Sequence, residues 1–276
     1  LTGPAIDSPW LPRETYLALG VRRSLFLDDE RARVYDLFEK YLAWLRANSL
    51  YDGNVVAQQL LASATQRYDF VVVDEAQDLT NIQLALVLRM LRRPEAFLLC
   101  GDSNQVVHPN FFSWANVKTL FFQHEELAPR RRVEVLRANY RNAVEVTELA
   151  NRLLQLKLAR FGSVDRESHY LVEATPGNRG SVELLPDRDE AVAELDASTS
   201  GSVRFAVIVL REDDKPEAAR RFRTPLLFSV QEAKGLEYEN IILYNLVSGA
   251  RTDFASIASG VVASDLESDI AYGMMS

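Results

Sequence analysis

Two short apolar runs, each followed closely by acidic residues, constrain the fold of this chain more than any other feature. Residues 70–73 precede Asp74 and Glu75, and residues 96–100 precede a Gly-Asp pair that ends at Asp102. Runs this short and this rich in apolar residues are typical of strands buried on both faces. Such strands, joined by a helix through short connections, predict a parallel α/β sheet.

The same alternation of helices and strands continues along the chain. Apolar spacing predicts that one face of a helix over 29–47 is formed by Val34, Leu37, Phe38, Tyr41 and Leu45. The further expected helices are 54–64, Thr80 to Leu91 with a Thr80–Gln83 capping box, one from Asn142 with Val146, Leu149, Ala150 and Leu153 on one face, 189–195 and 216–222. The further expected strands are 133–136, 182–185, 205–210, 226–230 and 241–246. We therefore expect two α/β units, the first carrying an N-terminal helical segment.

Composition excludes several classes of protein. The 276 residues suffice for about two domains, and 47% apolar with 25% charged residues is typical of globular proteins. No apolar run approaches the ~20 residues of a membrane span. With a single cysteine, Cys100, and no signal peptide, a reducing cytoplasm is expected. The net charge of −8 disfavours nucleic-acid binding by bulk charge, so any nucleic acid must be held in a local groove.

Acidic residues at neighbouring strand ends suit one kind of chemistry. Ligands of parallel α/β sheets bind at the carboxyl ends of the strands, where Asp74, Glu75 and Asp102 are expected. One carboxylate can hold Mg²⁺, usually through water, while its neighbour orients or deprotonates an attacking water. Taken alone, the Asp-Glu pair is more simply a loop that opens a helix, and the wider sequence decides between these interpretations.

Four segments resemble, in order, the motifs of superfamily 1 helicases of the UvrD/Rep type. They are 71–78 (Val-Val-Val-Asp-Glu-Ala-Gln-Asp, motif II), 98–105 (Leu-Leu-Cys-Gly-Asp-Ser-Asn-Gln, motif III), 136–141 (Leu-Arg-Ala-Asn-Tyr-Arg, motif IV) and 229–238 (Ser-Val-Gln-Glu-Ala-Lys-Gly-Leu-Glu-Tyr, motif V). The resemblance covers roughly residues 68–246. It implies an α/β fold of RecA-like P-loop NTPase motor domains, with parallel sheets flanked by helices, one domain partial and one nearly complete, preceded by a helical subdomain.

The resemblance implies roles at the first two motifs. Asp74 would coordinate Mg²⁺, and Glu75 would be the catalytic base. Gln105 would sense the γ-phosphate of ATP and couple it to DNA. ATP and Mg²⁺ are therefore the implied cofactors.

Motifs IV and V imply the remaining nucleotide contacts. Tyr140 would stack on adenine, for which a flat aromatic face is suited, and Arg141 would be the arginine finger. Glu237 would accept hydrogen bonds from the ribose hydroxyls, and Gly235 would allow close backbone approach. The plainer alternatives are a core aromatic at Tyr140, a surface ion pair at Arg141 and a solvated strand-edge charge at Glu237.

Single-stranded DNA is the implied partner. Motif III of the family continues into aromatic residues that stack on DNA bases; here His108 stands where the family often has Tyr, and Phe112 or Trp114 is the expected stacking residue. The alternative is that both aromatic rings pack in the core. Gln231 replaces a common His at a DNA-contacting position of motif V. The arginines at 130–132 either contact phosphates or solvate a linker.

The family's phosphate loop, Gly-x-x-x-x-Gly-Lys-Ser/Thr, is missing from this sequence. None of the 12 glycines is followed by lysine, and residues 269–276 do not supply motif VI. The phosphate loop and motif VI, which this sequence lacks, are therefore expected to be supplied by the rest of its own motor. No membrane association is expected, and the sequence specifies no protein partner. The implied division is 1–66 (helical, 1B-like), 67–132 (C-terminal half of domain 1A) and 133–276 (domain 2A without a large 2B insertion).

These observations predict a fragment of an ATP-dependent DNA helicase or translocase of DNA repair or recombination, 3′ to 5′ by resemblance. The isolated chain is expected to be inactive, because the phosphate loop is absent. One alternative is a non-catalytic nucleic-acid-binding scaffold that keeps the helicase fold. Another is a subunit of a helicase–nuclease.

Overall fold

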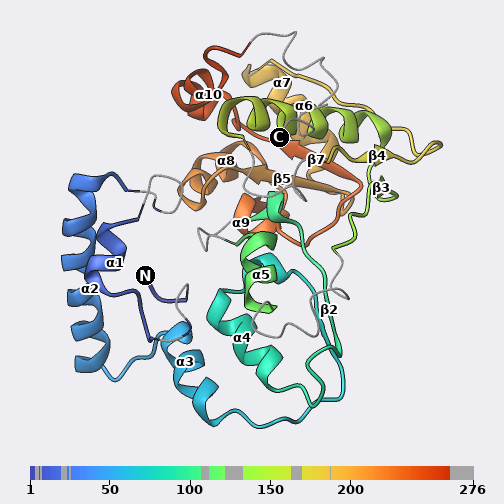
Figure 1. The fold of residues 1–276 in the computed structure, drawn as a ribbon. Coiled ribbons are helices and arrows are strands. Elements are labelled where there is room, and N and C mark those ends of the chain that lie inside the picture. Colours follow the sequence, from blue (N-terminus) through green and yellow to red (C-terminus); the bar gives the residue numbers. More distant parts are fainter. Residues whose placement is uncertain are drawn as a thin grey trace. The chain divides into compact units, whose positions relative to one another are not determined.

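The structure is a computed structural model that describes residues 1–3, 6, 8–19, 24, 26–106, 112–121, 133–162, 170–186 and 188–261. The described residues of Leu1–Val135, together with Tyr170, form one compact unit, unit 1. Those of Leu136–Gly162 and Leu171–Ser276 form a second, unit 2. Within the described part of the chain every strand pair is parallel (Figure 1). The predicted α/β class is therefore confirmed.

Unit 1 begins with the helices α1 (Arg13–Leu17) and α2 (Asp28–Ala47). The extent of α2 agrees with the sequence prediction, but its buried face is rotated. Leu37 is 67% exposed and Tyr41 is also exposed, whereas Tyr35 and Leu42 are buried. The cluster beneath α2 consists of Tyr16, Tyr35, Phe38, Leu42 and Leu45. Tyr16 of α1 is in this cluster, and periodicity within α2 alone could not indicate where α1 would pack.

Helix α3 (Gly53–Ser63) follows a short turn. Its N-cap is Asp52, whose Oδ1 accepts hydrogen bonds from the backbone N–H groups of Asn54 (2.8 Å) and Val55 (3.1 Å). A carboxylate in this position satisfies donors that the first helical turn leaves unpaired. Tyr41 of α2 donates to the other oxygen of Asp52 at 3.1 Å and so ties the two helices together.

The strands β1 (Val71–Val73) and β2 (Phe97–Leu99) pair directly and are joined through α4 (Asn81–Arg89). The backbone N–H of Thr80 donates to Gln83 Oε1 at 3.0 Å, which is one half of the predicted capping box. One face of the strand pair packs on a core of Ala76, Leu84, Phe112 and Val117. The opposite face carries Val72 and Leu98, which are 61% and 51% exposed, so the expectation of burial on both faces was wrong in this chain.

Unit 2 begins with β3 (Ala138–Asn139), which pairs with β4 (Glu173–Ala174) across α6 (Val144–Phe161). The strand expected at 133–136 is not formed, because pairing with β4 begins two residues later and Leu136 stays 90% exposed. Helix α6 is also rotated from its predicted face. Val146 and Leu149 are exposed, while Thr147 is buried.

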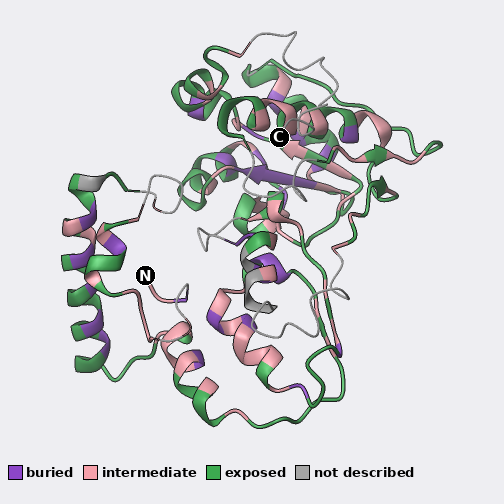
Figure 2. Ribbon diagram, in the orientation of Figure 1, coloured by how far each residue is buried: buried purple, intermediate pink, exposed green. Residues whose placement is uncertain are grey.

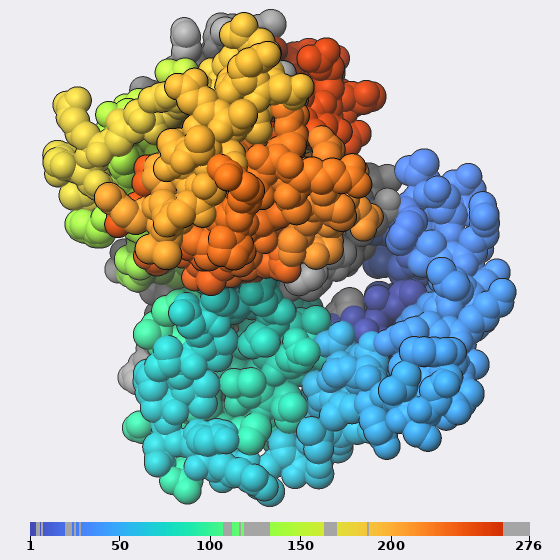
Figure 3. All heavy atoms as spheres, turned by 180° about the vertical axis from the view of Figure 1, so that it is seen from behind, coloured from blue at the N-terminus to red at the C-terminus, as the bar shows by residue number. Residues whose placement is uncertain are grey.

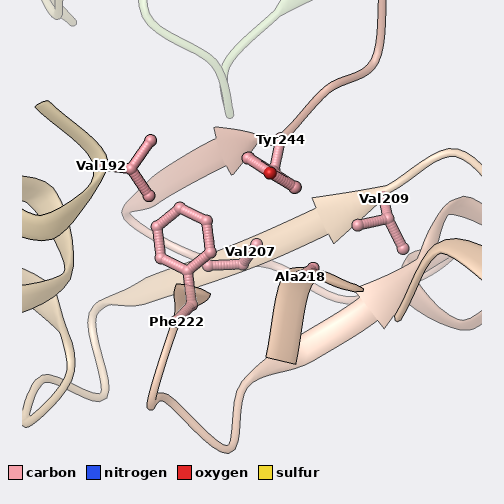
Figure 4. Close-up of a cluster of buried hydrophobic side chains, with 6 residues drawn as sticks. All are labelled: Val192, Val207, Val209, Ala218, Phe222 and Tyr244. Atoms are coloured by element: carbon pink, nitrogen blue, oxygen red, sulfur yellow. The ribbon is translucent and has the colours of Figure 1, made fainter. Parts of the chain in front are cut away.

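The main sheet of unit 2 has the order β6 (Leu227–Ser229), β5 (Phe205–Val209), β7 (Asn240–Leu243). The central strand β5 is almost wholly buried (Figure 2). Helices α7 (Asp189–Thr199) and α8 (Lys215–Arg221) contact each other, and Val192 and Ala218 from them pack on β5. Figure 3 shows the surface of unit 2 in this part of the sequence, coloured gold to orange. Figure 4 shows the core between these layers, Val192, Val207, Val209, Ala218, Phe222 and Tyr244.

Several elements differ from the sequence expectation. Residues 182–185 form no strand, and Leu184 is fully exposed, since an apolar run becomes a strand only where a neighbouring edge accepts it. The helices α5 (Trp114–Phe121), α9 (Val230–Ala233) and α10 (Arg251–Ala258) were not expected. None of the described helices combines the length and apolarity that a membrane crossing needs.

Candidate functional site

The carboxyl ends of β1 and β2 place motifs II and III side by side. The backbone N–H of Cys100 donates to Val73 O, and that of Ala76 donates to Cys100 O, each at 2.8 Å. The ladder therefore extends past both strands and fixes the two following loops against each other. Asp74 and Glu75 leave β1 here and are both exposed.

Glu75 occupies an unusual backbone conformation. Its φ of 52° and ψ of 41° are left-handed, which is uncommon for a residue other than glycine. The turn is held by Asp74, whose Oδ1 accepts from the Glu75 N–H at 2.9 Å, and by the Asp78 N–H, which donates to Glu75 O at 2.9 Å. Left-handed residues of this kind concentrate at functional sites.

Motif III forms a short turn, η2 (Ser103–Gln105), capped by Asp102. Asp102 Oδ1 accepts from the Asn104 N–H at 2.8 Å, and its Oδ2 accepts from Gln105 Nε2 at 2.9 Å. Gln105 itself is exposed. The predicted γ-phosphate sensor is thus held in place through its amide by the carboxylate three residues earlier.

Sequence reasoning missed Gln77, the residue that joins these two loops. Its side chain is fully buried, donates to the Glu75 carboxylate and accepts from the Asp102 N–H. The sequence does contain a signal, because Gln77 lies within motif II (71–78) and Gly101 precedes Asp102 in motif III. Neither residue was given a role, since burial and close approach are decided only in three dimensions.

The described residues offer an exposed carboxylate at a strand end but no enclosed metal cage. They contain no group of three or more His, Cys, Asp or Glu side chains arranged to enclose a metal. Mg²⁺ bound with a nucleotide characteristically uses one or two protein carboxylates, water and phosphate oxygens. Asp74, exposed at the end of β1, can supply one such carboxylate.

Of the predicted DNA-stacking residues of motif III, Phe112 is buried, only 7% exposed, in the core of unit 1. Its ring meets the Trp114 ring edge to face, with centroids 5.2 Å apart. Phe112 therefore offers no free face to a base, and the core alternative describes it. Trp114 is only partly buried and stays a candidate, while His108 and the arginines at 130–132 lie outside the described residues.

Motif IV presents its two predicted nucleotide contacts just after β3. Asn139 Oδ1 accepts from the N–H groups of Arg141 (2.9 Å) and Asn142 (3.0 Å), which forms the turn. Tyr140 is 77% exposed, so it is not the core aromatic that the plainer interpretation expects. Arg141 Nε lies 2.8 Å from Glu237 Oε1 of motif V, and both side chains remain more than half exposed.

Motif V follows β6 and is ordered by charge. Ser229 caps α9, and its N–H donates to Glu232 Oε2 at 2.9 Å. Lys215 Nζ approaches the same carboxylate to 2.8 Å, and this hydrogen bond, followed by that from Ser229, lowers the pKa of Glu232 to about 2. The loop then reaches Gly235, whose φ of +79° favours glycine and whose surroundings are open. Gln231 is exposed on α9.

Each unit therefore gathers its own predicted residues. Asp74, Glu75 and Gln105 meet at the ends of β1 and β2, and Tyr140, Arg141, Gly235 and Glu237 lie on the loops after β3 and β6. A separate small hollow in unit 2, at the ends of β5 and β7, is lined by Val209, Arg211, Asp214 and Tyr244 among others. None of the predicted site residues lines it.

Part of this chain matches a known protein family. Residues 28–126 match the model of the UvrD/REP helicase N-terminal domain. This segment contains Asp74, Glu75 and Gln105 and ends before motifs IV and V. The chain is thus related to DNA helicases of the UvrD/Rep type.

Individual relatives extend the comparison. A putative ATP-dependent DNA helicase, YjcD, of Bacillus subtilis is 25% identical over 49% of this chain and 19% of its own length. The ATP-dependent DNA helicase Rep of Buchnera aphidicola is 27% identical over 45% of this chain and 20% of its length. The human TPR and ankyrin repeat-containing protein 1 is 23% identical over 85% of this chain but only 9% of its length. The chain spans a fifth or less of each of these relatives.

Proposed function

We propose that this chain is part of an ATP-dependent motor that moves along single-stranded DNA, with 3′ to 5′ polarity and a role in DNA repair or recombination. The observation that carries the proposal is the junction of motifs II and III at the ends of β1 and β2, within the segment matched by the helicase family model. Parallel sheets bind their ligands at such strand ends.

The residues of unit 1 have complementary tasks in this proposal. Asp74 holds Mg²⁺, which when bound neutralises charge on the phosphate oxygens. Glu75 orients the attacking water and accepts its proton, for which its position on a constrained turn is suited. Gln105 contacts the γ-phosphate and changes its position when that phosphate leaves.

The residues of unit 2 complete the nucleotide contacts in this proposal. Tyr140 stacks on adenine and Arg141 stabilises the charge on the transferring phosphoryl group. Arg141 and Glu237 pair with each other in the structure, so nucleotide binding exchanges this contact for a phosphate and a ribose. Exposed ion pairs contribute little to stability, which makes this exchange inexpensive.

A second candidate function is a non-catalytic scaffold that keeps the helicase fold. The relative aligned over most of this chain is named for TPR and ankyrin repeats and not for a helicase, which favours a helicase-like module within a larger repeat protein. The two candidates differ in one feature of the full-length sequence. A Gly-x-x-x-x-Gly-Lys-Ser/Thr loop on the N-terminal side of motif II supports the motor, and its absence favours the scaffold.

The decisive experiment measures ATP hydrolysis by the full-length protein with and without single-stranded DNA, beside its Glu75→Gln variant. We expect turnover that DNA stimulates and that the variant lacks. Absent or DNA-independent turnover overturns the motor proposal. The chain described here, which contains no Gly-Lys pair, is expected to show no turnover above the Glu75→Gln background; measurable turnover contradicts that expectation.

A further inference from the structure

The buried side chain of Gln77 lies between two functional segments that are far apart in sequence. It is fully buried, although an amide buried without partners is costly. Its Nε2 donates to Glu75 Oε2, and its Oε1 accepts from the Asp102 N–H at 2.9 Å. One neutral side chain therefore binds the proposed base of motif II and the backbone of motif III at once.

The packing around Gly101 shows that this contact is built into the fold. A Cβ atom on Gly101 would lie 2.6 Å from Gln77 Oε1 and 3.2 Å from the Ala76 backbone nitrogen. Gly101 does not have a positive φ, so its conformation does not require glycine. The close approach of the Gln77 amide, together with the backbone of Ala76 and Gln77, is what favours glycine there.

The hydrogen bonds continue from Gln77 to the proposed phosphate sensor. The Asp102 residue whose N–H binds Gln77 also accepts from Gln105 Nε2 at 2.9 Å. An unbroken path thus runs from the Glu75 carboxylate through Gln77 and Asp102 to Gln105. The two links made by Gln77 are partly buried, where hydrogen bonds hold geometry most firmly, and the last link, from Gln105 to Asp102, is exposed.

We infer that Gln77 is a positioning residue that holds Glu75 and the Asp102–Gln105 segment as one unit, so that the water-orienting carboxylate and the phosphate sensor move together. This inference rests on the proposed motor function. Gln77 touches no nucleotide in this scheme. It acts through Glu75 and Asp102, and it adds to the motif residues a link that the motif pattern does not assign.

The link itself can be tested in this chain without any activity. Gln77→Met keeps the side-chain volume but removes both hydrogen bonds, so the Asp102 amide should exchange with solvent about 10-fold faster or more. Gln59→Met, on the exposed face of α3, is the matched control and should leave that amide unchanged. An Asp102 amide that exchanges equally in all three proteins overturns the inference.

A second pair of variants covers the case in which Gln77→Met fails to fold. Gly101→Ala should lower the thermal midpoint of unit 1, whereas Gly201→Ala, with open space around its Cβ, should not. In a Gln77→Ala background the loss from Gly101→Ala should shrink, because the nearest colliding atom is gone. Strictly additive losses contradict the proposed contact.

The functional arm uses the full-length protein. Gln77→Met should lower kcat about 10- to 100-fold, because a misplaced carboxylate loses alignment, while KM for ATP stays within about two-fold since the nucleotide contacts are intact. An unchanged kcat, or a fall matched by a large rise in KM, refutes the positioning role. If the wild-type protein shows no ATPase, the motor proposal fails instead, and the exchange experiment on this chain still judges the Gln77 link.

Discussion

The predicted site residues of unit 1 and those of unit 2 are held in place by different forces. In unit 1, Glu75 and Gln105 are linked through the buried neutral amide of Gln77, the Asp102 N–H and the Asp102 carboxylate. In unit 2, motif V is fixed by the Lys215–Glu232 pair and meets motif IV through an exposed pair, Arg141–Glu237. Buried hydrogen bonds resist salt, whereas exposed ion pairs are screened by it. Unit 1 therefore fixes its predicted residues through buried polar groups, whereas Arg141 and Glu237 of unit 2 stay exposed.

The largest expected effect falls on unit 1. Glu75→Gln in the full-length protein should lower kcat for ATP hydrolysis about 10²- to 10⁴-fold, the usual contribution of a general base. KM for ATP should change little, and the midpoint of thermal unfolding should stay at the wild-type value, because Glu75 is exposed. Steady-state kinetics beside thermal denaturation measures both, and retained turnover removes Glu75 from its proposed role.

The next effect is on the stability of unit 2. Asp196 is 6% exposed and accepts from the Arg223 N–H at 2.8 Å and from its Nε at 2.7 Å. Asp196→Ala should destabilise unit 2 by about 1.5–3 kcal/mol, the value of hydrogen bonds to a charged group. Urea denaturation followed by a probe in unit 2 measures the loss, with Asp213→Ala on an exposed turn as control.

The pH dependence of this loss has a defined sign. The backbone hydrogen bond from Arg223, aided by its side chain, lowers the pKa of Asp196 in the folded state. The carboxylate therefore stabilises unit 2 fully above its ordinary pKa, and the contribution is lost as pH falls through the lowered value. The difference between wild type and Asp196→Ala should narrow below pH about 4; a difference that widens there contradicts the assignment.

A smaller effect is expected at the Lys215–Glu232 ion pair of unit 2. Lys215 lowers the pKa of Glu232 to about 2, so the pair should support motif V above the ordinary pKa of glutamate and lose its effect as pH falls toward 2. Glu232→Gln should reduce the protection of the α9 backbone amides from hydrogen exchange at neutral pH. Added salt should make the difference in protection between wild type and variant smaller. A salt-independent gap would show that the Ser229 cap, and not the ion pair, orders this segment.

The smallest effect is expected at the Arg141–Glu237 pair. Both side chains are more than half exposed, so Glu237→Gln should leave the unfolding midpoint of unit 2 unchanged within error. In the full-length protein the same change should raise KM for ATP, because Glu237 is the proposed ribose contact. A clear loss of stability would mean that this pair is structural, and would weaken the distinction between the predicted residues of unit 1 and those of unit 2.

Sequence patterns located the ends of β1 and β2 but not the buried faces of the helices. The apolar runs alone predicted that the acidic residues after them lie at the carboxyl ends of β1 and β2, because strand-helix-strand order brings the ends of parallel strands to one edge of the sheet. The predicted buried faces of α2 and α6 were wrong, because each helix carries apolar residues on more than one side, such as the exposed Leu37 and Val146. Which side is buried depends on the element that packs against the helix, and the periodicity of the helix gives no information about that element.

The candidate site divides in the same way. The order of the four motifs was sufficient to assign Glu75, Gln105, Tyr140 and Arg141 to a proposed nucleotide site, and these assignments stay predictions. Residues whose importance depends on burial were misjudged or missed. Phe112 proved to be a core residue, and Gln77 proved to be a link between motifs.

The sequence by itself determined the α/β class, the likeness to UvrD/Rep-type helicases and the lack of any Gly-Lys pair, because each depends only on local patterns of residue type. The tertiary structure decided which side chains are buried and which approach each other. Gly101 illustrates the reason. Its φ does not call for glycine, and a Cβ is excluded by the close approach of the Gln77 amide and the Ala76 backbone, from about 24 residues earlier in the chain.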